Sequence, residues 1–314
     1  MSLPAPPPMP TRHRAGPLRR LLRRPGGRRR VPPVSVLPSL MTLGNLVCGF
    51  AAIHYATKPL AASGFFNWST LTLAGALVFL GMAFDAIDGA LARLTRSTSD
   101  LGAQLDSLAD VVTFGVAPAF MMLRLVTEYV GPTATATAPI LGPEADNLYA
   151  RAVWGVAAVY ICCAALRLAR FNVETESHRP EDHGTFRGLP SPGAGGTVAS
   201  AIILHQHLAA TRYVGSEFPA FDRWTALGTP LLTLLCGLAM VSTIRYVHVV
   251  NRYLRGSRDF AVVVRIVLPI AAAIWFFHVT LAVAFAAYAL SGPLRACMLV
   301  LRRRQRGAAG GAPQ

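Results

Sequence analysis

Four aspartates, Asp85, Asp88, Asp106 and Asp110, lie in the apolar stretches on either side of a polar turn in the segment FDAIDGALARLTRSTSDLGAQLDSLADVVTFG. Asp85 and Asp88 are three residues apart, which places them on one face of a helix. Asp106 and Asp110 are four residues apart and share a face in the same way. The polar turn at 94–101 lets the two helices run antiparallel with their acidic faces opposed. Converging carboxylates repel one another without cations between them, and oxygen ligands suit magnesium, manganese or calcium, so the spacing predicts a divalent-metal site.

Small residues and one arginine accompany the acids. Gly89 and Ala92 lie on or beside the face of the first aspartate pair, and Gly102 lies one turn before the second pair. They leave room for a bulky ligand or for the close approach of another helix. Arg93 follows, and a guanidinium can bind a phosphate through paired hydrogen bonds. This combination predicts a site for a phosphorylated lipid. A structural polar cluster or an ion pathway would explain the acids, but not the small residues and the arginine that accompany them.

The composition indicates that the elements carrying these residues lie in a membrane. Apolar residues make up 53% of the chain and charged residues 14%, against roughly 25% charged in soluble domains. The mean hydropathy is +0.43. An aspartate at the bilayer centre costs at least about 2.5 kcal/mol on insertion scales, so a group of them points to function. A soluble nucleic-acid-binding module, a wholly disordered chain and a disulfide-stapled small protein are excluded.

Apolar stretches long enough to cross the hydrocarbon, about 20 residues, define the predicted spans. They are Val36–Thr57, Leu71–Leu91, Leu105–Val126, Ala152–Phe171, Ala194–His207 with its flanks, and Ala226–Val247. A last apolar region, Phe260–Leu290, is too long for one upright span and slightly short for two spans with a loop.

The distribution of positive charge orients the chain. Lys and Arg number 30 against 15 acids, and nine arginines fall within residues 1–30. Further arginines follow the second, fourth and sixth spans, and positive charge marks cytoplasmic loops. The arginines at 302–304 and 306 reach the same side only if Phe260–Leu290 forms a pair of helices.

We therefore predict an all-α polytopic membrane helix bundle with about eight transmembrane helices and both termini cytoplasmic. Its predicted parts are a basic, flexible tail (1–34), a transmembrane domain (35–300) and a basic, glycine-rich tail (301–314).

The pattern D-x2-D-G-x2-A-R-x8-G-x3-D-x3-D, which runs from Asp85 to Asp110, resembles the complete signature of the CDP-alcohol phosphotransferases. The resemblance implies that a phosphatidyl group passes from a CDP-activated lipid to an alcohol, releasing CMP. It also implies a pair of Mg²⁺ or Mn²⁺ ions and a homodimer. The metal ligands implied are Asp85, Asp88, Asp106 and Asp110, the last also acting as general base. The residues implied along the CDP-lipid are Gly89, Ala92, Arg93 and Gly102.

Four flanking segments are similar to bacterial membrane-embedded phosphatidylserine synthases. They are LPSLMTLGNLVCGF (Leu37–Phe50), RLARFNVETE (Arg167–Glu176), FRGLPSPGAGG (Phe186–Gly196) and YALSGP (Tyr288–Pro293). This resemblance implies transfer from CDP-diacylglycerol to L-serine in phospholipid biosynthesis. It also implies a bacterial inner-membrane location, an active site at the cytoplasmic face, and membrane lipids rather than nucleic acid as partners. Glycerol 3-phosphate or inositol as acceptor is the alternative within the family. An ion or solute transporter and a non-catalytic scaffold are alternatives of other classes.

Four polar residues outside the signature are further candidates. Arg167 and Arg170 are three residues apart at the inner end of the fourth span. They either bind the serine carboxylate or the diphosphate, or are topology charges that contact lipid phosphates. Thr42 and Asn45 share one face of the first span. They either touch the nucleotide or bond a neighbouring helix.

Overall fold

The computed structural model describes residues 36–60, 62–63, 68–95, 100–130, 142–144, 147–176, 185–212, 219–247 and 276–309. The chain divides into two units, Met1–Pro32 and Pro33–Gln314, and all described residues belong to the second. The predicted N-terminal tail and the first half of the last apolar region lie outside the described residues.

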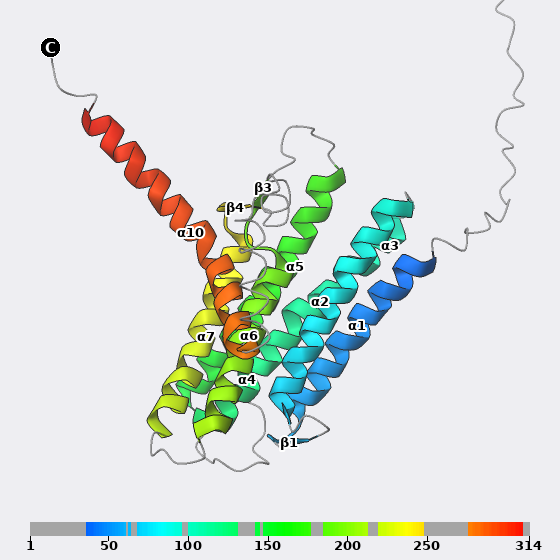
Figure 1. Ribbon diagram of the computed structural model, residues 1–314, viewed down its shortest axis with the longest axis vertical. Helices are drawn as coiled ribbons and strands as arrows, with labels where there is room; N and C mark the ends of the chain where they lie inside the picture. The colour runs from blue at the N-terminus through cyan, green and yellow to red at the C-terminus, as the bar shows by residue number, and fades with distance from the viewer. Residues whose placement is uncertain are drawn as a thin grey trace, which may run out of the picture. The chain divides into compact units, whose positions relative to one another are not determined.

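The described part of the chain is built from helices (Figure 1). They are α1 (Val36–Thr57), α2 (Thr70–Thr95), α3 (Asp100–Asp110), η2 (Val111–Val116), α4 (Ala117–Val130), α5 (Leu148–Glu176), α6 (Ser191–Arg212), α7 (Pro219–Val241) and α10 (Phe277–Ala309). Within this part, 6 helices are long and apolar enough to cross a membrane. The predicted all-α class and the membrane character are therefore confirmed.

The third predicted span is a continuous run of α3, η2 and α4, and it forms the centre of the bundle. In the most apolar stretch of this run, 78% of the residues are buried by the protein. The corresponding share is 33–39% in α1, α2, α5 and α7. The central segment η2 is a π-helix in which the Ala117 amide bonds the Val112 carbonyl, five residues earlier. It begins directly after Asp110, and such wide turns occur often at functional sites.

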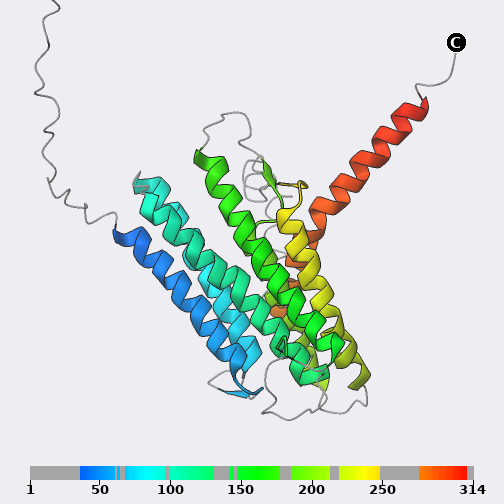
Figure 2. The ribbon, with the colours of Figure 1, turned by 180° about the vertical axis from the view of Figure 1, so that it is seen from behind.

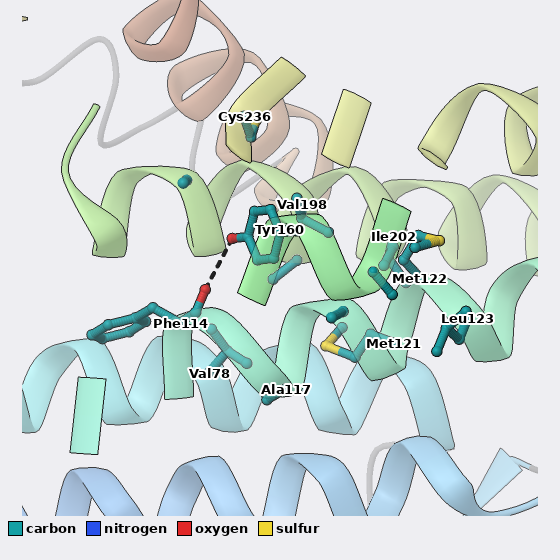
Figure 3. Packing of buried hydrophobic residues seen from close by; sticks show 14 of the residues in the cluster. Val78, Phe114, Ala117, Met121, Met122, Leu123, Tyr160, Val198, Ile202 and Cys236 are labelled. Carbon is teal, nitrogen blue, oxygen red and sulfur yellow. Dashed lines mark hydrogen bonds between the residues drawn. The ribbon is translucent and has the colours of Figure 1, made fainter. Parts of the chain in front are cut away.

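A buried hydrogen bond crosses the core beside the π-helix (Figure 3). The Tyr160 hydroxyl, fully buried on α5, donates a hydrogen bond of 2.9 Å to the Phe114 carbonyl of η2. Val78, Val198 and Ile202 belong to the same buried cluster. The hydrogen bond therefore connects α5 to the turn that follows Asp110.

We expect Tyr160→Phe to lower the free energy of unfolding by about 1 kcal/mol, because the buried Phe114 carbonyl loses its donor. The measurement is unfolding of the detergent-solubilised protein. Tyr149→Phe is the matched control, since the Tyr149 hydroxyl is buried and has no hydrogen-bond partner among the described residues. Equal stability of the two variants would contradict a stabilising hydrogen bond at the Phe114 carbonyl.

The fifth predicted span is α6, a 22-residue helix that is not among the six apolar candidates. It contacts α2, α4, α7, η2 and α10. Most of its residues from Ser191 to Ala209 are buried by these neighbours rather than left to lipid, including Thr197, Ser200 and Gln206. Because other helices cover it, α6 needs less apolar surface than a lipid-facing span.

The prediction that the sixth span continues to Val247 is wrong. Helix α7 ends at Val241, where the Ser242 side chain donates to the Ala239 carbonyl and accepts a weak hydrogen bond from the Ile244 amide. The following residues form β4 (Arg245–Val247), which pairs antiparallel with β3 (Thr185–Arg187). A second small sheet joins β1 (Ala62–Ser63) to β2 (Trp68–Ser69).

The last apolar region contributes one described helix, α10, which runs through the predicted C-terminal tail segment as far as Ala309. In its most apolar stretch, only 6% of the residues are buried by the protein. Its C-terminal half extends away from the other helices in both views (Figures 1 and 2). Its N-terminal half packs against α6.

Candidate active site

The structure brings the acids of α2 and α3 together. One carboxylate oxygen from each of Asp85, Asp88 and Asp106 lies within 4.8 Å of the others. Helices α1, α2 and α3 lie side by side in both ribbon views (Figures 1 and 2). The i,i+3 spacing in α2 and the connection 96–99 between the helices account for the convergence.

Asp110 lies one helical turn beyond Asp106 on α3 and is buried. Its charge interacts with those of Asp85 and Asp106. Its Oδ1 accepts a hydrogen bond of 3.1 Å from the Asn45 side-chain amide of α1. Asp110 therefore adjoins the three-carboxylate group, with one oxygen held by a neutral donor.

Helix α1 positions two of the four acids. The Thr42 hydroxyl donates to Asp88 Oδ2 at 2.9 Å, in addition to the Asn45 bond to Asp110. Thr113, in η2, donates its hydroxyl to the Asn45 backbone carbonyl at 2.9 Å. Thr42 and Asn45 thus bond neighbouring helices, which is one of the two alternatives predicted; contact with a nucleotide stays a prediction.

Close helix packing behind these bonds depends on a glycine of α2. A Cβ at Gly81 would lie 2.7 Å from Cγ2 of Thr113 and 2.8 Å from Oδ1 of Asn45. Real Cβ atoms do not approach so closely, so any side chain would push Asn45 or η2 away. Gly81 therefore fixes the distance between α1, α2 and the π-helix behind the acids.

The donor set fits a hard divalent cation. Ligands about 2.0–2.6 Å from such an ion lie within about 5 Å of one another, as the three carboxylate oxygens do. Asp106 Oδ1 is buried and has no hydrogen-bond partner among the described residues. A buried charged oxygen without a donor is costly, and a cation would satisfy it.

Arg167 faces the same acids from α5. It is largely buried, and its charge interacts with those of Asp110 and Asp85. Its Nη1 donates a hydrogen bond of 2.5 Å to the buried Ser191 hydroxyl on the first turn of α6. Arg170, one turn further along α5, is partly exposed.

The remaining predicted ligand contacts lie on the two acidic helices. Gly89 on α2 and Gly102 on α3 are partly buried. Ala92 and Arg93 belong to α2, but their side chains lie outside the described residues.

Two further contacts that shape the site were not predicted from the sequence. Ser191 is the hydrogen-bond partner of Arg167. Ser107, adjacent to Asp106, exchanges hydrogen bonds with the Asn172 side chain of α5 at 2.9 and 3.2 Å. A serine on α3 and an asparagine on the fourth span are the only local signal for this α3–α5 link, and no spacing rule pairs residues 65 positions apart.

The fold and site define a membrane-embedded protein in which three carboxylates converge beside a largely buried arginine. The profile of the CDP-alcohol phosphatidyltransferase family matches residues 35–241, which contain all four aspartates and Arg167. The chain belongs to this family.

The chain is also similar to individual family proteins named CDP-diacylglycerol–serine O-phosphatidyltransferase. One from Helicobacter pylori is 32% identical over 216 residues, covering 69% of this chain and 73% of the relative. One from Bacillus subtilis is 34% identical over 162 residues, covering 52% and 72%. One from the archaeon Methanocaldococcus jannaschii is 31% identical over 176 residues, covering 56% and 64%.

Proposed function

We propose that this protein transfers the phosphatidyl group of CDP-diacylglycerol to the hydroxyl of L-serine, forming phosphatidylserine and CMP. The observation that carries the proposal is the convergence of Asp85, Asp88 and Asp106, with Asp110 and Arg167 adjoining them. The names of the relatives in bacteria and an archaeon support serine as the acceptor.

Asp85, Asp88, Asp106 and Asp110 hold the divalent ions, a pair of Mg²⁺ or Mn²⁺. When bound, these ions neutralise the charge of the diphosphate and of the CMP leaving group. The protein's own contribution is to keep the carboxylates in place: Thr42 bonds Asp88, and Gly81 lets α1 and η2 close on α2.

Asp110 is the general base. As the serine oxygen bonds to the phosphorus that carries diacylglycerol, the bond from that phosphorus to the oxygen of CMP breaks. The serine proton passes to the Asp110 carboxylate, and CMP leaves with the bond electrons. Asn45 donates to one Asp110 oxygen, which orients the carboxylate so that the other oxygen is left for the proton.

The two arginines of α5 bind anionic parts of the substrates. Arg167, whose guanidinium is held by Ser191, grips the carboxylate of serine or the diphosphate, and Arg170 assists one helical turn away. Gly89, Ala92, Arg93 and Gly102 lie along the CDP moiety, and Thr42 and Asn45 adjoin the nucleotide.

The protein lies in the inner membrane of a bacterium with about eight spans and both termini in the cytoplasm. The basic tail (1–34) and the C-terminal segment (301–314) flank the transmembrane domain (35–300), and the active site opens at the cytoplasmic face. The active form is a homodimer. The alternation of arginine-rich loops along the sequence supports this orientation.

The acceptor is tested by supplying purified protein with CDP-diacylglycerol and, separately, serine, glycerol 3-phosphate or inositol. We expect CMP release and a new phospholipid with serine only, because the relatives of this chain are named as serine phosphatidyltransferases. If phosphatidylglycerophosphate is the main product, the acceptor is glycerol 3-phosphate and not serine. Cation flux into vesicles without CMP release would favour a transporter.

A further inference from the structure

The segment that leads from β3 into α6 makes a left-handed turn at Gly188. Its φ is +85°, a conformation that residues with a side chain rarely adopt. A Cβ at this position would also collide with the Met240 carbonyl oxygen, and it would lie 3.2 Å from the Ser242 carbonyl oxygen. These two carbonyls belong to the end of α7 and to the residue that follows it. Only glycine therefore fits this turn against α7.

Two backbone amides of the turn bind the end of α7. The Gly188 amide donates to the Ile244 carbonyl at 2.8 Å, which continues the β3–β4 pairing by one residue. The Leu189 amide donates to the Ala239 carbonyl at 3.0 Å. The last four carbonyls of a helix have no partner inside it, so this bond satisfies one of them from outside. The Leu189 side chain is fully buried, which further fixes the turn.

The turn determines where α6 begins. The Ala194 amide donates to the Pro190 carbonyl at 2.9 Å, so helical bonding starts directly after the turn. Ser191 is the first residue of α6 and is fully buried. It lies between Pro190 and Pro192, whose rings fix their φ angles. Little backbone freedom is therefore left between Gly188 and the Ser191 hydroxyl.

The Ser191 hydroxyl connects this turn to the site. It accepts a hydrogen bond of 2.5 Å from Nη1 of Arg167 on α5. The β3–β4 pair lies at the end of the bundle where α5 ends (Figures 1 and 2). The donors of a guanidinium lie in one plane in fixed directions, so the bond to Ser191 also sets the direction of the others. A displaced turn would move Ser191 and leave Arg167 differently oriented.

We propose that Gly188 is a positioning residue. Its turn, bonded to the end of α7, places Ser191 so that Arg167 directs its remaining donors at the anionic group of a substrate. This inference rests on the proposed phosphatidyl transfer, in which Arg167 binds the serine carboxylate or the diphosphate. Gly188 acts through Ser191 and Arg167 and does not itself touch the substrates. A misplacement of about 1 Å in such a group can cost about 100-fold in rate.

The test is a double-mutant cycle of Gly188→Ala and Ser191→Ala. The initial rate of CMP release is measured with both substrates below their KM, so that a loss is seen whichever anion Arg167 binds. Ser191→Ala should lower this rate about tenfold, the loss typical of one hydrogen bond to a charged group. Gly188→Ala should lower it about tenfold or more. The double variant should be no slower than the slower single variant, because both changes break the same connection.

Gly75→Ala is the matched control. A Cβ at Gly75 would also be too close to its neighbours, 2.7 Å from the Ile203 side chain, but Gly75 lies on α2 ten residues before Asp85. We expect this variant to have a lower Tm and a rate within about twofold of wild type. Its loss of Tm should add to that of Ser191→Ala, as expected for distant sites. The Tm losses of Gly188→Ala and Ser191→Ala should be less than additive, which is a readout independent of turnover.

Ser242→Ala perturbs the same turn more mildly and serves if Gly188→Ala does not fold. The Ser242 hydroxyl donates at 2.8 Å to the Ala239 carbonyl, which also accepts the Leu189 amide. We expect this variant to lose about threefold in rate when Ser191 is present, the size of one ordinary hydrogen bond. In the Ser191→Ala background, it should cause no further loss.

Rate losses that multiply in the double variants would overturn the inference, because Gly188 would then act independently of Ser191. An unchanged rate in Ser191→Ala, or a Gly188→Ala rate within about twofold of wild type, would overturn it as well. Wild-type protein that releases no CMP with serine, glycerol 3-phosphate or inositol would instead overturn the proposed function. The Tm values would still show whether Gly188 and Ser191 are connected.

Discussion

Asp110→Asn is expected to lower kcat by about 10²–10⁴-fold, the contribution typical of a positioned general base. Asparagine has nearly the same shape, and its side-chain oxygen can still accept the hydrogen bond from Asn45. The fold around η2 should therefore persist, whereas the variant has no carboxylate to take the serine proton. The measurement is CMP release from CDP-diacylglycerol and serine by protein reconstituted in lipid.

Asp222→Asn is the control for this change, since Asp222 lies in the first turn of α7, outside the acidic cluster. We expect it to retain activity within about twofold. Thermal unfolding of both variants checks that each is folded. Turnover by folded Asp110→Asn within a factor of ten of wild type would remove Asp110 from the role of base.

Removal of divalent cations should have an effect of similar size. We expect a chelator to lower CMP release by about 1,000-fold or more, because the metal contribution to phosphoryl transfer is worth several kcal/mol. Magnesium or manganese should restore activity, since Asp85, Asp88 and Asp106 offer oxygen ligands only. The activity assay is titrated with each metal after chelation.

Binding can be measured without turnover. A ligand that binds only the folded state raises its stability, so magnesium or manganese should raise the Tm of the chelated wild type. Asp106→Asn should lose most of this shift, because it neutralises the carboxylate whose buried Oδ1 has no hydrogen-bond partner among the described residues. Full activity in excess chelator, or an equal Tm shift in Asp106→Asn, would contradict a metal site at these acids.

The convergence of the aspartates could be predicted because it depends on local geometry. Residues three or four apart share a helix face in any tertiary structure, and a short connection keeps α2 and α3 neighbours. Apolar length is equally local: the first predicted span and α1 have the same bounds, Val36–Thr57.

Other boundaries depended on contacts that no local pattern contains. The sequence pattern predicts that the sixth span continues to Val247, but α7 ends at Val241 and Arg245–Val247 pair with a strand about 60 positions earlier. Helix α6 is less apolar than its neighbours because they, rather than lipid, cover it.

The sequence by itself determined the class of the protein, the acidic helices and the chemistry that four carboxylates and an arginine permit. Only the tertiary structure decided which side chains hold them: Asn45 bonds Asp110, and Ser191 bonds Arg167. The physical reason is that helical periodicity relates residues within a few turns. Contacts between residues 24 or 65 positions apart arise from how whole helices pack, through glycines that let backbones approach and through hydrogen bonds buried between them.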